Sequence, residues 1–161
     1  MPVVSATPDP QALTVTLVTD LPRPPSEVWP VWADARRLER WWGPPSWPAT
    51  VTAHDLRPGG RTDYVMTGPD GDRARGLWRV LAADAPRSLS VEDSFADAEG
   101  APDTTLPTTR MDAVLEAVPT GTRMTVVSTF TSAEQMEQVL AMGALEGMTE
   151  AMGQIDAVLA D

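Results

Sequence analysis

Apolar and polar residues alternate along several stretches of the chain, and this two-residue period is typical of β-strands with one buried face. Residues 13–19 alternate apolar side chains with threonine and predict the first strand. Three prolines between positions 22 and 25 end it, and two short helices are predicted next, the second over residues 35–42 with Asp34 as its N-cap. Turns rich in Gly, Pro and Asp then separate six predicted strands: residues 50–56, 62–67, 74–82, 89–95, 109–117 and 123–130.

The apolar period changes from two to about 3.6 residues in the last part of the chain, which predicts a helix. Ser132 followed by Gln135 is a capping box, and no proline follows it up to Asp161. At ~1.5 Å per residue, a helix over this segment would be roughly 40 Å long, enough to cross a whole sheet. The positions that recur in steps of three and four are Met136, Val139, Leu140, Gly143, Gly147, Met148, Ala151, Met152, Ile155, Val158 and Leu159.

One strand, two short helices, six strands and one long helix predict an α+β domain. The economical packing is a curved seven-stranded antiparallel sheet around the C-terminal helix, with the short helices closing one end. A pocket is expected between such a sheet and its helix. Residues 1–12 have prolines and no apolar period, so we expect a loose arm whose removal shifts the melting temperature by only a few degrees. Residues 13–161 are expected to form a single domain.

Composition narrows the possible functions. The net charge is −11, and the twelve basic residues are all arginines without a basic run, which argues against a nucleic-acid partner. The chain has no cysteine, and His54 is its one histidine, so we expect no disulfide, metal site or cofactor. The apolar stretches are far shorter than the ~18 residues of a membrane span. The first residues do not form a secretory signal, so a cytoplasmic protein is expected.

Few residues suggest catalysis. His54 is predicted to be structural or solvent-facing, because no nucleophile-elbow sequence accompanies it. The pattern does not decide which face of the strand over residues 50–56 looks inward. Asp55 and Arg57 flank a Gly-Gly turn, where a structural ion pair is expected. The acidic residues that lack the spacing of a calcium loop, and are therefore predicted to be solvated, are Glu92, Asp93, Asp97, Glu99 and Asp103.

Tryptophan and methionine are the distinctive apolar residues of this chain. Five of the six tryptophans lie between residues 29 and 47, where they either fill the core or form an aromatic rim at a pocket mouth. Exposed tryptophans there could also pack against a partner protein or a second copy of the chain, so a homodimer stays an alternative. Methionines fill gaps in cores and also line adaptable apolar pockets.

Several short motifs occur in the order of a known family. They are Arg40-Trp41-Trp42-Gly43-Pro44, Asp55-Leu56-Arg57-Pro58-Gly59-Gly60-Arg61, Met66-Thr67-Gly68-Pro69-Asp70-Gly71, Gly121-Thr122-Arg123-Met124-Thr125 and Glu146-Gly147-Met148. In these motifs the chain resembles the family named after the activator of heat-shock protein 90 ATPase, within the START and polyketide-cyclase superfamily. The resemblance runs from about Leu13 to Leu159 and implies a helix-grip fold with a pocket for an apolar ligand. It also implies two alternatives: a module that modulates a chaperone ATPase, or an enzyme of the cyclase or dehydratase type.

The expected function is non-covalent binding of a small apolar molecule, with no catalytic residue assigned. Tyr64 is expected to give the ligand polar orientation. The enzyme alternative requires Tyr64, His54 or Asp55 to face the cavity as an acid or base. The residues predicted to line the pocket are Trp42, Tyr64, Met66, Trp78, Met148 and Met152.

Two glycines in the long helix allow a more local prediction. Gly143 and Gly147 are four residues apart, so they would share one helix face and form a shallow notch. The notch would serve either a close backbone contact or pocket volume beside Met148. In the second case, Gly147→Ala leaves stability unchanged or slightly higher, because helix propensity rises. Gly147→Leu would instead weaken uptake of an apolar dye.

Overall fold

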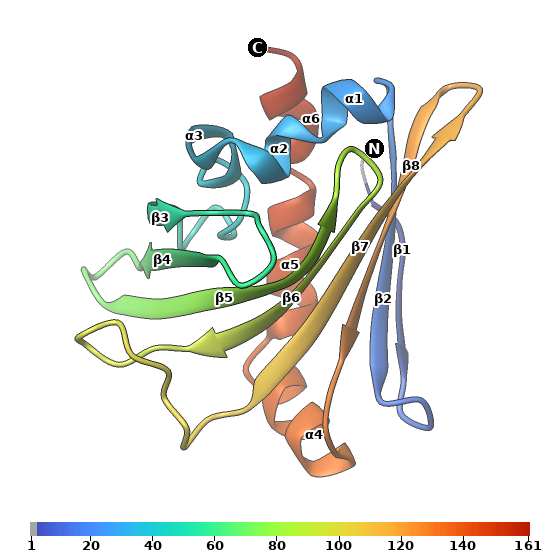
Figure 1. Cartoon of the computed structure of the whole chain (residues 1–161). Coiled ribbons are helices and arrows are strands. Elements are labelled where there is room, and N and C mark those ends of the chain that lie inside the picture. The colour runs from blue at the N-terminus through green and yellow to red at the C-terminus, as the bar shows by residue number, and fades with distance from the viewer. Residues whose placement is uncertain (1–2) are drawn as a thin grey trace.

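An antiparallel sheet curves around the C-terminal helices in the computed structural model, which describes residues 3–161 (Figure 1). Within these residues the sheet has eight strands, in the order β1-β2-β8-β7-β6-β5-β4-β3. The strands are β1 (Val3–Asp9), β2 (Thr14–Leu21), β3 (Ala49–His54), β4 (Arg61–Thr67), β5 (Arg73–Asp84), β6 (Ser88–Phe95), β7 (Thr108–Val118) and β8 (Gly121–Thr129). The helices are α1 (Pro25–Val28), α2 (Pro30–Ala33), α3 (Ala35–Leu38), α4 (Ala133–Ala141), α5 (Ala144–Met152) and α6 (Ile155–Leu159).

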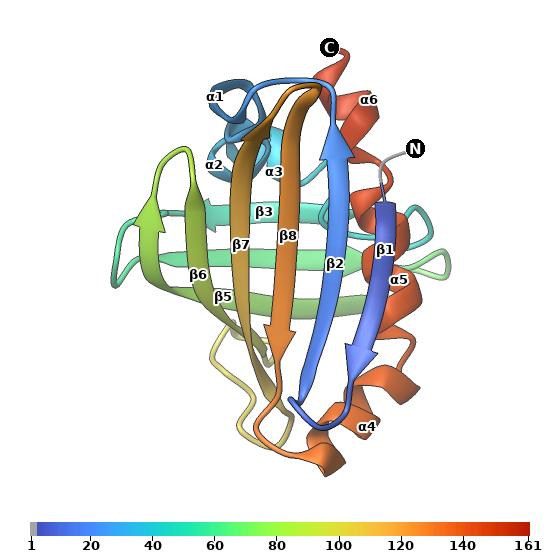
Figure 2. The same cartoon turned by 90° about the vertical axis from the view of Figure 1, so that its right-hand side faces the viewer.

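The strand direction changes strongly across the sheet. Strands β3, β4 and β5 run nearly crosswise to β1, β2, β7 and β8 (Figure 2), because successive strands twist in the same sense. From β3 to β8 each strand pairs with the next along the chain, and β2 joins this meander by pairing with β8. Helix α5 contacts β1 and β2, and α1 to α3 close one end of the curve.

The N-terminal segment belongs to the sheet. Strand β1 pairs with β2 in a register that runs from Val3 opposite Thr19 to Asp9 opposite Thr14. The carboxylate of Asp9 accepts the backbone N–H of Gln11 at 3.1 Å in the connecting turn. The prediction of a loose arm was therefore wrong for residues 3–12, and residues 1–2 lie outside the described part. A proline-containing strand fits here because β1 is at the sheet edge, where a missing N–H is tolerated. This strand makes the sheet eight-stranded instead of seven-stranded.

The aromatic-rich segment forms three short helices where two were predicted. Pro30 is the first residue of α2 and ends the regular turns of α1, because it has no N–H to donate. Asp34 begins α3 as predicted, and its Oδ1 atom accepts the backbone N–H of Arg36 at 2.9 Å.

The C-terminal helix is interrupted. Its start is as predicted, because the Ser132 hydroxyl accepts the backbone N–H of Gln135 at 3.1 Å. Gly143, however, has a φ of 84°, in the left-handed region that glycine adopts without steric penalty, and it separates α4 from α5. A further break at Gly153 and Gln154 separates α5 from α6. The prediction of one continuous helix was wrong. Gly143 is the N-cap of α5 instead of a residue inside a helix, and its carbonyl accepts the backbone N–H of Gly147 at 2.9 Å.

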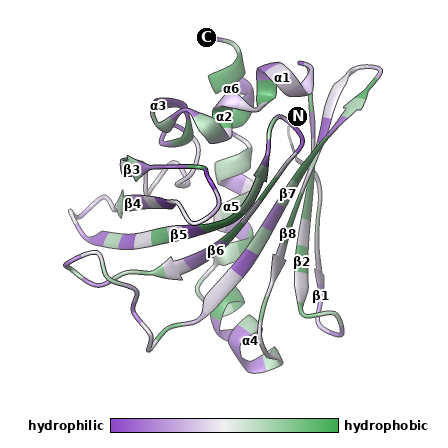
Figure 3. Ribbon diagram, viewed as in Figure 1, coloured by the Kyte–Doolittle hydropathy of each residue, from purple (hydrophilic) through white to green (hydrophobic). Residues whose placement is uncertain are grey.

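Most of the tryptophans pack in the core. Trp32, Trp41 and Trp78 are fully buried, and the rings of Trp32 and Trp41 meet edge to face with centroids 4.8 Å apart. The indole N–H of Trp41 donates to the Val31 carbonyl at 2.8 Å. Along β5 and β7, hydrophobic positions alternate with hydrophilic ones (Figure 3), as expected for strands that bury one face. The core therefore lies between the sheet, the short helices and the C-terminal helices, which contribute Met136, Met152 and Ile155.

Candidate functional site

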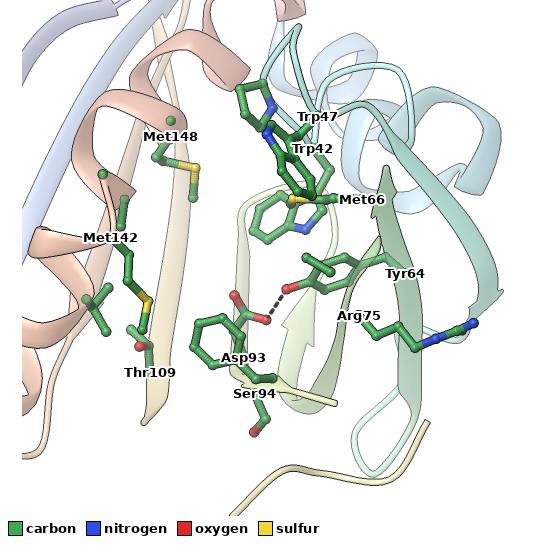
Figure 4. Close-up of a pocket in the computed structure, with 17 residues that line it drawn as sticks. Trp42, Trp47, Tyr64, Met66, Arg75, Asp93, Ser94, Thr109, Met142 and Met148 are labelled. Carbon is green, nitrogen blue, oxygen red and sulfur yellow. Dashed lines mark hydrogen bonds between the residues drawn. The ribbon is translucent and has the colours of Figure 1, made fainter. Parts of the chain in front are cut away.

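A cavity of about 430 Å³ lies between the sheet and the C-terminal helices (Figure 4). One wall comes from β4, β5, β6 and β7, and the opposite wall comes from α4, α5 and the Gly143 junction between them. The loop after α3 adds two aromatic side chains. The residues that line the cavity are Trp42, Pro44, Trp47, Tyr64, Met66, Ala74, Arg75, Asp93, Ser94, Phe95, Thr109, Val139, Met142, Gly143, Ala144, Gly147 and Met148.

Four of the six residues expected at a pocket line this cavity: Trp42, Tyr64, Met66 and Met148. Trp78 and Met152 do not line it; both are fully buried in the core. Trp78 packs edge to face against Trp42, with ring centroids 4.8 Å apart, and of these two rings Trp42 is the one that lines the cavity. Whether these residues bind a ligand stays a prediction.

The polar end of the cavity is a tyrosine paired with an aspartate. The hydroxyl of Tyr64, on β4, donates to Oδ1 of Asp93, on β6, at 2.7 Å across the intervening strand (Figure 4). Gly76, on β5 between them, makes this reach possible, because a Cβ atom there would overlap the phenol ring of Tyr64.

Sequence reasoning missed Asp93 by assigning it to a solvated acidic loop, and that prediction was wrong. Asp93 is in β6, two and four residues beyond the buried side chains of Val91 and Leu89. Alternation along a strand puts these three side chains on one face. That two-residue period was the sequence signal that would have found it.

Burial changes the acidity of both members of this pair. Removal from water raises the pKa of Asp93 to about 7, although the hydrogen bond from Tyr64 acts in the opposite direction. The pKa of Tyr64 lies well above its usual value, first because of burial and then because of the neighbouring Asp93 charge. Near neutral pH, the Tyr64 hydroxyl therefore keeps its proton and donates a hydrogen bond, whereas Asp93 is present in both protonation states.

Trp42 and Trp47 form the aromatic wall. Trp42 is almost fully buried and meets Tyr64 edge to face, with ring centroids 5.7 Å apart. Trp47 is half-buried and packs over Gly68, where a Cβ atom would come within 2.6 Å of the indole ring.

The other two acid–base candidates lie outside the cavity. One ring nitrogen of His54 is 2.8 Å from the Thr62 hydroxyl, and the other is 2.7 Å from the Trp32 carbonyl oxygen. His54 therefore ties α2 to the β3–β4 hairpin. Asp55 forms the predicted ion pair with Arg57 at 2.8 Å on the surface. Neither face of β3 looks inward along its whole length, because a register shift after Val51 interrupts the alternation of the strand.

The half-buried His54 predicts a loss of stability in acid. Its pKa is lowered, chiefly by burial, so the unfolded chain binds a proton on His54 at a higher pH than the folded protein does. Its contribution is therefore complete above about pH 6.5 and is lost as the pH falls through the folded value. We expect the wild type to lose more stability than His54→Gln on going from about pH 7.5 to about pH 5, measured by urea unfolding.

The difference between these two proteins isolates His54, because Asp93 titrates in the same range with the opposite sign. The raised pKa of Asp93 makes the folded state bind a proton more readily as the pH falls, which stabilises it. Equal pH dependence in both proteins would contradict the lowered pKa of His54.

Two features that residues 3–161 lack also bear on function. No group of three or more His, Cys, Asp or Glu side chains is arranged to hold a metal ion. No helix in this part of the chain is both long enough and apolar enough to cross a membrane.

Comparison with known proteins identifies the family. The sequence model of the family described as "Activator of Hsp90 ATPase homolog 1-like protein" matches residues 22–160. The chain belongs to this family. The match includes the loop after α3, strands β4 to β7 and the C-terminal helices, which together form the cavity of this family member. A comparison with curated proteins returned no match.

Solved bacterial structures share the fold over almost the whole chain. A crystal structure of a Mycobacterium smegmatis protein is 47% identical, with a TM-score of 0.91, covering 98% of this chain and 97% of that one. A solution structure of an Arthrobacter aurescens protein is 48% identical, with a TM-score of 0.94, and the alignment covers 98% of this chain and 92% of that one. A Rhodobacter sphaeroides protein at 23% identity, with a TM-score of 0.82 and 97% of both chains covered, shows the likeness of fold alone.

Proposed function

We propose that this protein binds a small, mainly apolar molecule in the cavity between the sheet and α4–α5. The observation that supports this most is the lining itself. Aromatic rings and methionine side chains surround about 430 Å³ of space, with one hydrogen-bonded polar pair at the end. Apolar pockets with a few polar groups that fix orientation are the usual form of small-molecule sites.

Burial of apolar surface is sufficient to drive such binding. A ligand that buries ~300 Å² of apolar area gains roughly 7 kcal/mol at ~25 cal/mol per Å², before the costs of association. The thioethers of Met66 and Met148 adapt their shape to different ligands. No covalent step is needed for this function.

Gly147 offers a direct test of the proposal. A Cβ atom at Gly147 would have only Pro44 near it, at 4.0 Å, so the position has room on the cavity side. We expect Gly147→Leu to fill part of the cavity and to weaken Nile red binding about five-fold or more, measured by fluorescence titration. The control is Gly147→Ala, which we expect to bind the dye normally and to be as stable as the wild type or slightly more stable.

Two outcomes would count against the proposal. Unchanged Nile red binding by Gly147→Leu would mean that the dye does not occupy this cavity. A loss of ~2 kcal/mol or more in Gly147→Ala would indicate a tight backbone contact instead of pocket volume. Native mass spectrometry of freshly purified protein, searching for a co-purifying small molecule, addresses the identity of the ligand.

An enzymatic role is a second candidate, and one observation favours it. Of the three acid–base candidates from the sequence, Tyr64 lines the cavity, and it is paired with Asp93, whose pKa is about 7. A carboxyl group with a pKa near the working pH suits proton transfer. Conversion of a bound compound that is lost in both Tyr64→Phe and Asp93→Asn would support this role.

The family description supplies a further alternative, modulation of a chaperone ATPase. It is tested by ATP turnover of a bacterial Hsp90 protein with and without this protein. No change at saturating concentration would remove it.

A further inference from the structure

The carboxylate of Asp93 is only half used by the protein. Its Oδ1 atom accepts the Tyr64 hydroxyl, and its second oxygen points into the open part of the cavity, on the side of Met142 and Met148 (Figure 4). Tyr64 is the single hydrogen-bond partner of this side chain among the described residues. One carboxylate oxygen is therefore available to a ligand.

Among the described residues, no cationic group points into the cavity to offset this charge. The titratable residues that line it are Tyr64 on β4, Arg75 on β5 and Asp93 on β6. Residues of α4, α5, β7 and the loop after α3 contribute only apolar, proline, glycine and threonine side chains and indole rings. The guanidinium group of Arg75 points away from the cavity (Figure 4). Asp93 takes part in no ion pair within residues 3–161.

We propose that the ligand of this cavity is an amphiphile with a protonated amine, whose ammonium group binds the free oxygen of Asp93 while its apolar body packs against Trp42, Trp47 and Met148. This inference rests on the proposed binding function and adds the charge of the ligand. A charge-assisted hydrogen bond to a carboxylate is stronger than a neutral one, and it strengthens further away from water.

A carboxylate ligand is disfavoured by the same geometry. It would place a second negative charge beside Asp93, so that one of the two groups would have to take up a proton. The net charge of −11 adds a long-range field that repels anions and attracts cations. An alcohol would avoid repulsion but brings no positive charge, so its hydrogen bond to Asp93 lacks the Coulomb attraction that an ammonium group adds.

The test uses three probes with the same naphthalene body: 1-naphthalenemethylamine, 1-naphthalenemethanol and 1-naphthoate. Each is titrated into the full-length protein by calorimetry and by displacement of Nile red. We expect the amine to bind about ten-fold more tightly than the alcohol at about pH 8, and the naphthoate to bind most weakly. The amine should lose affinity towards about pH 6, as the carboxyl group takes up its proton, whereas the alcohol should not.

Two isosteric variants complete the test. Asp93→Asn removes the charge but keeps an acceptor for the Tyr64 hydroxyl, and it should reduce amine affinity about ten-fold while leaving alcohol affinity within about two-fold. Asp112→Asn is the matched control, because Asp112 pairs with Arg110 and Ser90 and does not line the cavity. It should leave all three affinities unchanged.

The outcomes separate this inference from the proposed function. Equal binding of the three probes, or tighter binding of the naphthoate, would overturn the amine preference while the cavity still binds apolar molecules. Unchanged amine affinity in Asp93→Asn would do the same. If neither the probes nor Nile red bind, the proposed function fails, and this inference fails with it.

Discussion

Replacing Trp78 with alanine is expected to lower the free energy of unfolding by about 3–5 kcal/mol. The side chain is fully buried, and its ring lies 4.8 Å from Trp42 and 6.0 Å from Trp32, centroid to centroid. Truncation would leave a cavity in the middle of this aromatic cluster, and the surrounding rings cannot collapse to fill it without losing their own contacts. Urea unfolding followed by tryptophan fluorescence measures the loss.

The matched control for Trp78→Ala is Trp47→Ala. Trp47 is half-buried on the cavity wall, so its truncation should cost about 1–2 kcal/mol and should instead weaken Nile red binding. The sequence predicted that Trp78 lines the pocket. If Trp78→Ala were nearly as stable as wild type but bound no dye, the position of Trp78 described here would be wrong.

Removing residues 1–12 is the second change with a large expected effect. It deletes β1 and leaves β2 as an exposed edge, with the backbone groups of residues 14–19 that pair with β1 facing water. We expect a loss of about 3 kcal/mol, which for a domain of this size lowers the melting temperature by roughly 6–12 °C. Circular dichroism during heating measures it.

A shorter deletion serves as the control for this truncation. Removal of residues 1–2 keeps the register from Val3 to Asp9, so it should leave the melting temperature within about 2 °C of the full chain. A full truncation that melts like the complete chain would restore the original expectation of a dispensable arm.

Much of the fold could be predicted from local patterns. Alternation located β2 to β8. The caps at Asp34 and Ser132 were predictable because a side-chain oxygen directly before a helix accepts a backbone N–H of the first helical turn. The failures are cases where tertiary structure outweighed local preference. Strand β1 contains a proline, Pro8, which an edge strand tolerates, and Gly143 adopts a positive φ that a periodic pattern does not reveal.

The candidate site was predictable as a set of apolar residues but not as a geometry. Trp42 and Trp78 have the same side chain and are both buried, and their order relative to the cavity depends on packing between distant segments. The Tyr64–Asp93 pair joins residues 29 positions apart through a glycine on the strand between them. Burial pattern along β6 could have indicated Asp93, but its partner could not be known before the strand order.

The pairing of β2 with β8 also determines when this protein can fold during its synthesis. Asp20 on β2 and Arg123 on β8 form an ion pair across a separation of 103 residues. At about 5–20 residues per second, a ribosome needs roughly 5–20 seconds to produce the chain between them. Throughout that time the β1–β2 hairpin has no sheet to join, and its apolar face stays unpaired. Folding of the whole domain is therefore a late event in translation, and the β1–β2 hairpin remains without its neighbouring strand until β8 has been made.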